Sequence, residues 1–409
     1  MKHLLCLVLC VGCLFGVLAV AQSTKREEFG SSLKRLQWDE QKQVTIEQKR
    51  EAAAPDDVLK VDTTLAIFDV LVLDAQGRSL TGFTKDDFVV TEDGARQEVT
   101  TFSLGDGSTV PRSIVLIIDY SGSQLPYIQN SIEAAKMLVD KLTPRDRMAI
   151  VTDDVELLVD FTQDKGKLKK SLDSLKKKAT GNRLGRSEQY SALFAALREL
   201  VKSEERPIIL FQTDGDELYR LQPIGESAPP QPNNPNAFEA RRKPYSFQDI
   251  YTTAQKSRVT IYTIIPGVQL AGRSQEEQFQ RAREIYAQRL HAMLKRTGND
   301  SLAAVQARMQ QMPDSYFQQM ITIQQRQQLA AAGIAKLTGG WTEFLEAPEQ
   351  ASTIYERILA GINRRYILGY YPTNDTRDGK LRKVKIELKG HPEYRILGKQ
   401  SYYAPAPEK

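Results

Sequence analysis

The feature that most constrains this chain is the alternation of apolar strands with amphipathic helices after residue 111. The run SIVLIID (113–119) is followed by SIEAAKMLVDKL, in which apolar residues recur at helical spacing. Further apolar runs, RMAIVTD, PIILFQTD and VTIYTII, are separated by other helical segments. Because apolar strands that alternate with helices are typical of parallel sheets covered on both faces, the pattern predicts an α/β fold over residues 111–364. We expect an open, mostly parallel, doubly wound sheet of Rossmann-like type.

Two stretches interrupt this pattern. Residues 221–244 are rich in Pro and Asn, which predicts an irregular loop. Residues 274–328 are rich in Gln and Arg, and a helical insertion is expected there. Its apolar stripe consists of Phe279, Ala282, Tyr286, Leu290 and Met293. We expect this stripe to pack on the domain; a groove for a partner is the alternative.

Both ends of the mature chain have β patterns. Residues 58–110 contain the apolar run Leu65–Leu73 and two alternating runs around an Asp93-Gly94 turn signal. Residues 365–409 contain YILGYYP, LRKVKIELKG and RILGKQSYY. Each end is too small to bury a convincing core alone. We therefore predict that the N-terminal module and the C-terminal strands join into one β-sandwich-like unit, into which the α/β domain is inserted.

The first residues have the pattern of an export signal. Lys2 and His3 precede the apolar stretch Leu4–Val20, and Ala19-Val20-Ala21 supplies small residues for cleavage near Ala21. Residues 1–21 are therefore predicted to be a signal peptide, and the protein to be secreted or periplasmic. The stretch is short for a membrane span of about 20 residues, so no stable span is expected after cleavage. Residues 22–57 are a charged lead-in or linker.

Composition excludes several kinds of chemistry. The three cysteines, Cys6, Cys10 and Cys13, all lie in the signal, which leaves no disulfide, thiol nucleophile or thiolate metal site in the exported chain. Of the histidines, only His291 and His391 remain, which argues against a histidine-based catalytic centre. The net charge of +5 is spread along the chain, so no nucleic-acid partner is expected.

Acids and hydroxyls gather where two apolar strands end. Asp119 ends the run Ile114–Ile118 and is followed by Ser121 and Ser123, while Asp214 ends the run IILFQT. In open parallel sheets, ligands collect beyond the carboxyl ends of the strands. Two acids brought together there would repel each other unless a cation lay between them. Carboxylate and hydroxyl oxygens suit Mg²⁺ or Mn²⁺, and with only two negative charges the ion would still accept an outside carboxylate.

These residues carry a resemblance to a known family. Asp119-Tyr120-Ser121-Gly122-Ser123 resembles the DxSxS of the metal-ion-dependent adhesion site (MIDAS) in von Willebrand factor A (VWA) domains, and Thr213-Asp214-Gly215 resembles the later TDG. The order of strands and helices agrees from Ser113 to about Asn363. Together with the flanks LTGFTKDDFVVTEDG and RYILGYYPTNDTRDGKLRKVKIELKG, the chain is similar to the VWA-related proteins of acidobacterial genomes.

The resemblance implies a further metal ligand. The family has a threonine in a Gly-Gly-Thr-x-Leu-Tyr setting, and this chain reads GNRLGRSEQYSAL, so that Ser187 falls at the threonine position. Ser187 either coordinates the metal or only caps the following helix. Three spare acids are interpreted as turn or surface residues: Asp153, Asp154 and Asp216.

The function expected from these features is binding rather than catalysis. Mg²⁺ or Mn²⁺ would be held by Asp119, Ser121, Ser123, Ser187 and Asp214, and a Glu or Asp of a protein partner would complete the shell, in cell adhesion or envelope assembly. Two alternatives stay open. One is a Mg²⁺-dependent phosphatase of haloacid dehalogenase type with Asp119 as nucleophile, although Ser121 stands where a second acid is wanted. The other is a purely architectural envelope protein.

Overall fold

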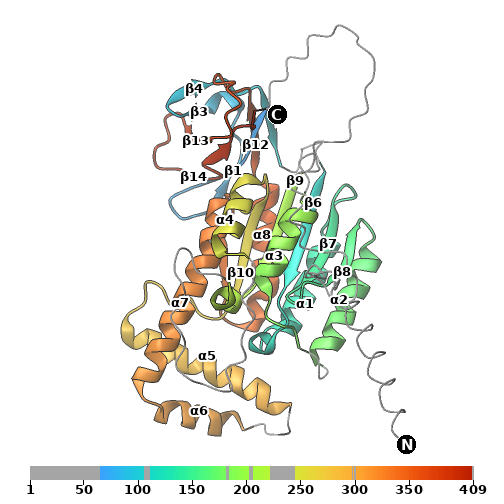
Figure 1. The fold of residues 1–409 in the computed structure, drawn as a ribbon, viewed down its shortest axis with the longest axis vertical. Coiled ribbons are helices and arrows are strands. Elements are labelled where there is room, and N and C mark those ends of the chain that lie inside the picture. The colour runs from blue at the N-terminus through green and yellow to red at the C-terminus, as the bar shows by residue number, and fades with distance from the viewer. Residues whose placement is uncertain are drawn as a thin grey trace, which may run out of the picture.

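The structure, a computed structural model, describes residues 65–105, 111–180, 184–201, 206–221, 245–296, 298 and 301–407. The predicted signal peptide (1–21) and lead-in (22–57) lie outside the described residues, as does all of the predicted 221–244 loop except Leu221. The described strands form three sheets (Figure 1).

The largest sheet belongs to the α/β domain and has the strand order β11-β10-β9-β6-β7-β8. Its strands are β6 (Arg112–Ile118), β7 (Arg147–Thr152), β8 (Leu157–Thr162), β9 (Arg206–Gln212), β10 (Thr260–Pro266) and β11 (Thr342–Leu345). All neighbours are parallel except β7 and β8, which pair antiparallel. The predicted mostly parallel α/β sheet is therefore present.

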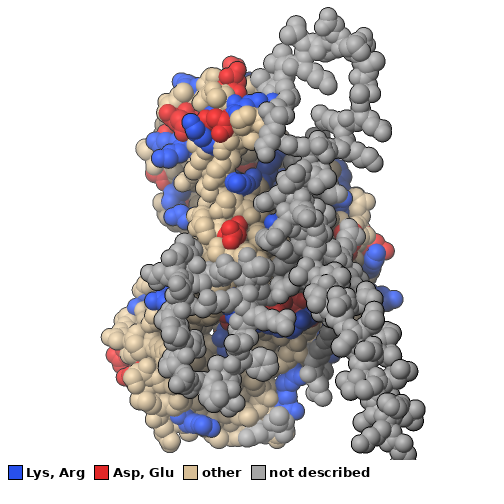
Figure 2. All heavy atoms as spheres, viewed as in Figure 1, with Lys and Arg blue, Asp and Glu red and all other residues tan. Residues whose placement is uncertain are grey.

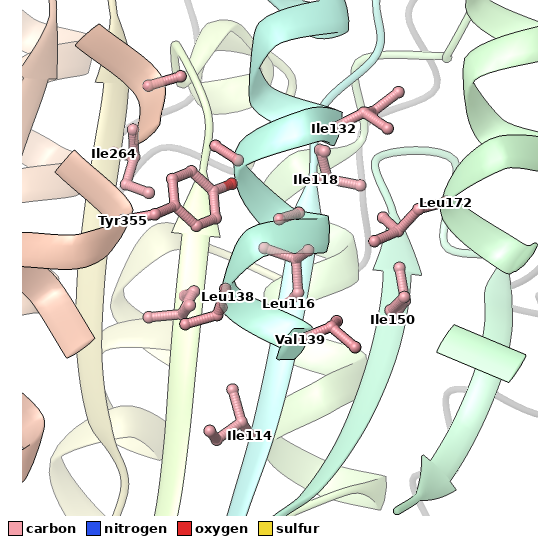
Figure 3. Packing of buried hydrophobic residues seen from close by; sticks show 14 of the residues in the cluster. Ile114, Leu116, Ile118, Ile132, Leu138, Val139, Ile150, Leu172, Ile264 and Tyr355 are labelled. Atoms are coloured by element: carbon pink, nitrogen blue, oxygen red, sulfur yellow. The ribbon is translucent and has the colours of Figure 1, made fainter. Parts of the chain in front are cut away.

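Helices cover both faces of this sheet because its central strand is apolar on both sides. Ile114, Leu116 and Ile118 of β6 pack in one hydrophobic cluster with helices on the first face (Figure 3). Val115 and Ile117 belong to a second cluster on the opposite face. The helices of the first face are α1 (Ile128–Asp140), α2 (Lys165–Thr180) and α8 (Ala351–Asn363); those of the second are α3 (Gln189–Glu199) and α4 (Phe247–Lys256).

The remaining strands come from the two ends of the chain and pair with one another. One sheet has the order β14-β1-β12-β5, with β2 beside β1; the other has the order β15-β13-β3-β4. The N-terminal strands are β1 (Ala66–Leu73), β2 (Ser79–Leu80), β3 (Phe88–Glu92), β4 (Ala95–Gln97) and β5 (Thr101–Leu104). The C-terminal strands are β12 (Tyr366–Tyr370), β13 (Leu381–Leu388), β14 (Arg395–Leu397) and β15 (Ser401–Tyr403). The run RILGKQSYY thus forms two short strands rather than one.

Both terminal sheets contribute to one hydrophobic cluster, which contains Phe68 of β1, Phe88 of β3, Tyr366 of β12 and Val384 of β13. Pairing in register joins distant segments, for example Ala66 with Tyr370 and Val90 with Ile386. The predicted turn between β3 and β4 is present, with positive φ at Asp93 (47°) and Gly94 (89°). We refer to these two sheets together as the terminal module.

The predicted helical insertion consists of α5 (Gln275–Lys295), α6 (Leu302–Gln311) and α7 (Asp314–Leu337). It has its own hydrophobic cluster, to which Ala282 and Phe317 contribute. Helix α7 passes through residue 328 without a break, so its last turns, with Ile334, already pack on the α/β core. Four residues of the predicted stripe pack in this cluster of the insertion itself and not in either cluster of the α/β core: Phe279, Ala282, Tyr286 and Leu290. The fifth, Met293, is 49% exposed.

The terminal module and the insertion lie at opposite ends of the central sheet (Figure 1). On the face shown in Figure 2, the acidic and basic side chains of the described residues are interspersed over the terminal module. Among the described residues, no helix is both long enough and apolar enough to cross a membrane. The short helices η2 (Lys85–Asp87), η3 (Gly122–Gln124), η4 (Asp216–Arg220) and η5 (Pro348–Gln350) complete the structure.

Candidate functional site

The site lies at the carboxyl edge of the central sheet, where β6 and β9 end side by side. These parallel strands pair in register up to Ile118 and Gln212, and the amide of Asp119 donates to the carbonyl of Gln212 at 3.2 Å. Asp119 and Asp214 therefore begin neighbouring loops on the same edge, as predicted from the strand ends.

Asp119 is fully buried. Its Oδ1 accepts the amide N–H of Ser121 at 2.9 Å, and its Oδ2 accepts Nε2 of Gln189 at 2.8 Å. Burial raises the pKa of Asp119 well above its usual range, and the charges of the neighbouring carboxylates raise it further. The carboxylates concerned are Asp153, Asp214 and Asp216.

The two predicted hydroxyl ligands lie together beside Asp119. The chain turns into the short helix η3 directly after Ser121, and this turn brings Ser121 Oγ and Ser123 Oγ to 3.1 Å from each other. Ser121 is buried and Ser123 is half-buried. Gln124 Nε2 donates to Ser123 Oγ at 3.2 Å, so the Ser123 hydroxyl keeps a fixed position.

Asp214 has an incomplete set of partners. Only 6% of it is exposed, and its Oδ1 is buried with no hydrogen-bond donor among the described residues. Its Oδ2 lies 3.5 Å from Nη2 of Arg289. The next residue, Gly215, turns the chain at φ 75°, and a Cβ there would lie 3.1 Å from the hydroxyl of Tyr190. A buried carboxylate oxygen without a donor is the kind of atom that a cation stabilises.

Ser187 lies in the same cluster, on the side of Asp216. Its backbone has φ 57°, its amide donates to Asp153 Oδ2 at 2.8 Å, and its hydroxyl hydrogen-bonds the Asp216 carboxylate. Burial raises the pKa of Asp216 to about 6, and the charge of Asp214 adds to that rise. The N-cap of α3 is Glu188 rather than Ser187, so the capping role considered for Ser187 is wrong.

Asp153 and Asp154 lie in a turn after β7, as one of the two interpretations expects, but they are not surface residues, because Asp153 is fully buried and only 2% of Asp154 is exposed. Asp153 follows β7, which pairs in parallel with β6, so it is the third acid at the same edge. Its Oδ1 accepts the amide of Tyr120 at 3.1 Å. Burial raises the pKa of Asp153 to about 7, against the lowering effect of its backbone hydrogen bonds. In the sequence, Asp153 directly follows the apolar run RMAIVT, so the position of an acid at a strand end predicts this residue too.

A close approach of two loops brings Asp153 into the site. A Cβ on Gly185 would lie 2.1 Å from Asp153 Oδ1, so no larger residue fits at position 185 without movement. The amide of Gly185 donates to the carbonyl of Tyr120 at 3.3 Å. The loop that carries Ser187 is thereby held against the loop that follows Asp119.

Sequence reasoning also missed Gln189, the first residue of α3. Its Nε2 donates to Asp119 Oδ2 at 2.8 Å and to Asp216 Oδ1 at 2.7 Å. Its Oε1 accepts the amide of Glu217 at 3.3 Å, which directs the NH₂ group toward the carboxylates. Asp216 is therefore part of the site and not a spare surface acid.

The donors present fit a small hard cation. Among the described residues, no group of three or more His, Cys, Asp or Glu side chains is arranged to hold a metal ion. A set of two carboxylates with two or three hydroxyls is a different kind of site, and its oxygen atoms match the preference of Mg²⁺ and Mn²⁺. Buried acids with raised pKa values and a donorless Asp214 Oδ1 are observations that favour a positive ion here.

Neither histidine of the described chain takes part in this cluster. His291 lines a cavity of about 460 Å³ beside α1 and α5, and His391 stacks on Tyr394 with ring centroids 4.8 Å apart. Nothing in the described part of the site pairs a nucleophile with an imidazole base.

Comparison with known proteins gives a family match within the α/β domain. The profile of the von Willebrand factor type A domain matches residues 114–217, a range that includes both strand-end loops. Comparison with curated proteins gives no match.

Solved structures that align with this chain include two bacterial proteins and one mussel protein. BatB from Bacteroides thetaiotaomicron has 17% identity and a TM-score of 0.26, covering 39% of this chain and 67% of that one. Proximal thread matrix protein 1 from the mussel byssus has 12% identity and a TM-score of 0.32, covering 62% of this chain and about half (48%) of its own. The vWF domain of the type V pili tip protein Mfa5 from Porphyromonas gingivalis has 15% identity and a TM-score of 0.34, covering 63% and 96%.

These likenesses are too distant to carry an argument, so the assignment follows from the family profile and from the strands and loops themselves. The profile range coincides with the part of the chain that runs from β6 to the Asp214 loop. The chain contains a von Willebrand factor type A domain.

Proposed function

We propose that this is an exported VWA-domain protein that binds an acidic group of a protein partner through a divalent cation. The ion, Mg²⁺ or Mn²⁺, would be held by Asp119, Ser121, Ser123, Ser187 and Asp214. The observation that carries the proposal is the pair of buried carboxylates at the ends of the neighbouring strands β6 and β9, beside two hydroxyls 3.1 Å apart. Adhesion or envelope assembly is the role that such binding would serve.

The electrostatics of the loops support a cation. Burial raises the pKa of Asp119, and the charges of the neighbouring carboxylates raise it further. Burial and the charge of Asp214 likewise raise the pKa of Asp216. A divalent ion would offset this repulsion, and as a Lewis acid it would accept a carboxylate oxygen from outside the protein. The chain's own contribution is to keep the ligand oxygens fixed through the backbone amides and Gln189.

The terminal module has a supporting role in this proposal. The pairing of β1 with β12 and of β3 with β13, together with the shared hydrophobic cluster, supports a single β-sandwich-like unit. Arg206 at the start of β9 donates to Asp69 Oδ2 of β1 at 2.6 Å and so ties the module to the VWA domain. We propose that the module holds the amino edge of the central sheet while the opposite edge binds the partner.

The proposal assigns no enzymatic activity to the protein. A phosphatase of haloacid dehalogenase type needs an acid two residues after its nucleophile, and here Ser121 hydrogen-bonds Ser123 at that position. A purely architectural role can be distinguished from metal-bridged binding. In that case, loss of the metal would lower the stability of the protein without lowering its binding to a partner.

The test begins with the metal alone. Calorimetric titration with MnCl₂ should give one site in the wild-type protein, abolished by EDTA and by Asp119→Asn, and unchanged by Asp375→Asn on an exposed loop. Capture of envelope proteins should then require Mg²⁺ and an intact Asp119. Metal binding that survives in Asp119→Asn would exclude this site, and capture that ignores EDTA would exclude the metal-bridged mechanism.

A further inference from the structure

The helical insertion brings a cation to the candidate metal site. Arg289, in the middle of α5, places Nη2 at 3.5 Å from Asp214 Oδ2, and only 15% of its side chain is exposed. Among the described residues, this is the ion pair that reaches the Asp119, Asp153, Asp214 and Asp216 cluster. Arg220 also acts on this cluster, since its charge lowers the pKa of Asp216 against the larger effect of burial.

The contacts of Arg289 are incomplete for a buried guanidinium. Its Nη2 reaches the carbonyl of Pro266 at 3.5 Å, and its Nε is buried without an acceptor. A structural arginine–carboxylate pair is normally bidentate, with N···O distances near 2.8 Å. In this chain Arg112 and Asp146 form such a pair, at 2.7 and 2.5 Å. Arg289 therefore acts on Asp214 mainly through its positive charge, because the 3.5 Å distance is too long for a strong hydrogen bond.

The insertion lies directly against the loops that carry the proposed ligands. Helix α5 contacts η3, which contains Ser123, and α7 contacts η4, which follows Asp214. The hydroxyl of Tyr219 in η4 donates to the carbonyl of Ile323 in α7 at 3.2 Å. A Cβ on Gly215 would lie 3.4 Å from Gln327 of α7. Arg289 therefore belongs to a helix that packs against these loops, and only 15% of its side chain is exposed.

We propose that Arg289 is an internal counter-ion of the metal site, which competes with the divalent cation for Asp214 and couples metal binding to the position of α5. This inference rests on the proposed metal site. A guanidinium and a divalent cation that share one carboxylate repel each other, so each lowers the affinity of the carboxylate for the other. Metal binding then loosens the insertion, and a tightly docked insertion weakens metal binding by the same factor.

The experiment compares metal affinity in the full chain and three variants. Arg289→Gln removes the charge, Arg289→Lys keeps it, and Arg281→Gln removes a charge from the same helix where Arg281 pairs with Glu284. In calorimetric titrations with MnCl₂, Arg289→Gln should bind about tenfold more tightly or better, because a unit charge at this range shifts a neighbouring equilibrium by at least that factor. Arg289→Lys and Arg281→Gln should stay close to wild type.

A second readout follows the insertion itself. Hydrogen exchange of residues 275–295 should become faster when Mg²⁺ is added to the wild-type protein. In Arg289→Gln, exchange should already be fast without metal and should not respond to it. Circular dichroism melts establish that each variant is folded.

The outcomes separate the inference from the function on which it rests. Equal affinities in wild type and Arg289→Gln, or weaker binding in a folded Arg289→Gln, would overturn the role of Arg289 and leave the metal site standing. Failure of every variant to bind Mn²⁺ would overturn the metal site, and the inference with it. Binding in the wild-type protein that becomes tighter in Arg289→Gln alone would support both.

Discussion

At the scale of single residues, the site is a cluster of buried acids whose charges are offset by few donors. Gln189 serves two carboxylates at once, Asp119 and Asp216, while its own oxygen is held by the amide of Glu217. Asp119 and Asp153 also accept hydrogen bonds from loop amides, whereas Asp214 Oδ1 has no donor among the described residues. The side-chain amide of Gln189 therefore stabilises, through hydrogen bonds, two carboxylates that a bound cation would stabilise by its charge.

Replacing Gln189 tests this balance. Gln189→Leu keeps the volume but leaves two carboxylates and the Glu217 amide without their partner, so we expect a loss of about 1–3 kcal/mol of unfolding free energy in EDTA. Mg²⁺ should restore much of that loss. Chemical denaturation with and without Mg²⁺ measures both, and exposed Gln248→Leu is the control. An equal loss with and without Mg²⁺ would contradict the view that the amide substitutes for the ion.

A second residue-scale prediction concerns acid stability. Burial alone would raise the pKa of Asp146, but hydrogen bonds from Arg112 and the Thr143 amide outweigh burial and hold it below its usual value. A lowered folded-state pKa means that the pair stabilises the protein above the unfolded-state value, near 4, and that this contribution is lost as pH falls through the folded-state pKa. Asp146→Asn should therefore lower the unfolding free energy at pH 7 by about 3 kcal/mol.

The contrast is with an exposed pair. Asp173, whose carboxylate pairs with Lys136 at the surface, should contribute far less, because solvent screens an exposed ion pair. Urea titrations of Asp146→Asn and Asp173→Asn at pH 7 and pH 3 give the comparison. If the two variants lose the same stability at pH 7, the buried pair does not have the assigned role.

Two of the site acids could be predicted from the sequence, because an acid directly after an apolar run is visible in a few neighbouring residues. Asp119 and Asp214 each end an apolar strand, and strand ends in a parallel sheet meet. Gln189 and Arg289 could not be found in this way, because their contacts depend on the register of α3 and on how the insertion docks. Asp153 was predictable in principle, since it ends a third apolar strand.

At the scale of elements, the insertion is a small helical unit with its own core. Its helical character was predictable from the period of apolar residues, but its end was not, because α7 belongs to both the insertion and the α/β domain. Because α7 packs in both cores, a shift of the insertion core would also move the end of α7 that packs on the sheet. Phe317 is fully buried in that core, whereas 44% of the adjacent Tyr316 is exposed.

Substitution of Phe317 should act on the insertion first. Phe317→Ala removes a fully buried ring, a change that costs about 3–5 kcal/mol in a rigid core. Hydrogen exchange should accelerate over α5, α6 and the first half of α7, while β6 and β9 stay protected; Tyr316→Ala should change little. Equal acceleration in β6 would show that the insertion and the sheet unfold together.

At the scale of the whole molecule, the VWA domain separates the two halves of the terminal module. Strand β1 lies between β12 and β14, both of which come from the C-terminal tail. Arg365, fully buried, donates from Nη1 to the carbonyl of Asp69 at 2.8 Å. The pattern of apolar residues predicts that both ends of the chain form strands. It does not predict which strands pair, because that depends on contacts between distant parts of the sequence.

Truncation tests this arrangement. A chain that ends at residue 364 lacks β12 to β15, so β1 loses its neighbours on both sides except for β2. We expect residues 66–104 to exchange hydrogen freely in this variant while β6, β7 and β9 remain protected. Persistent protection of residues 66–104 would mean that the N-terminal strands are stable without the tail.

Asp69 and Arg365 are 296 positions apart in the sequence. Strand β1 is therefore synthesised long before the C-terminal strands with which it pairs. At about 5–20 residues per second, a ribosome needs about 15–60 s after making β1 to deliver its partner strand. Until then, the unpaired edge of β1 is open to pairing with other nascent chains.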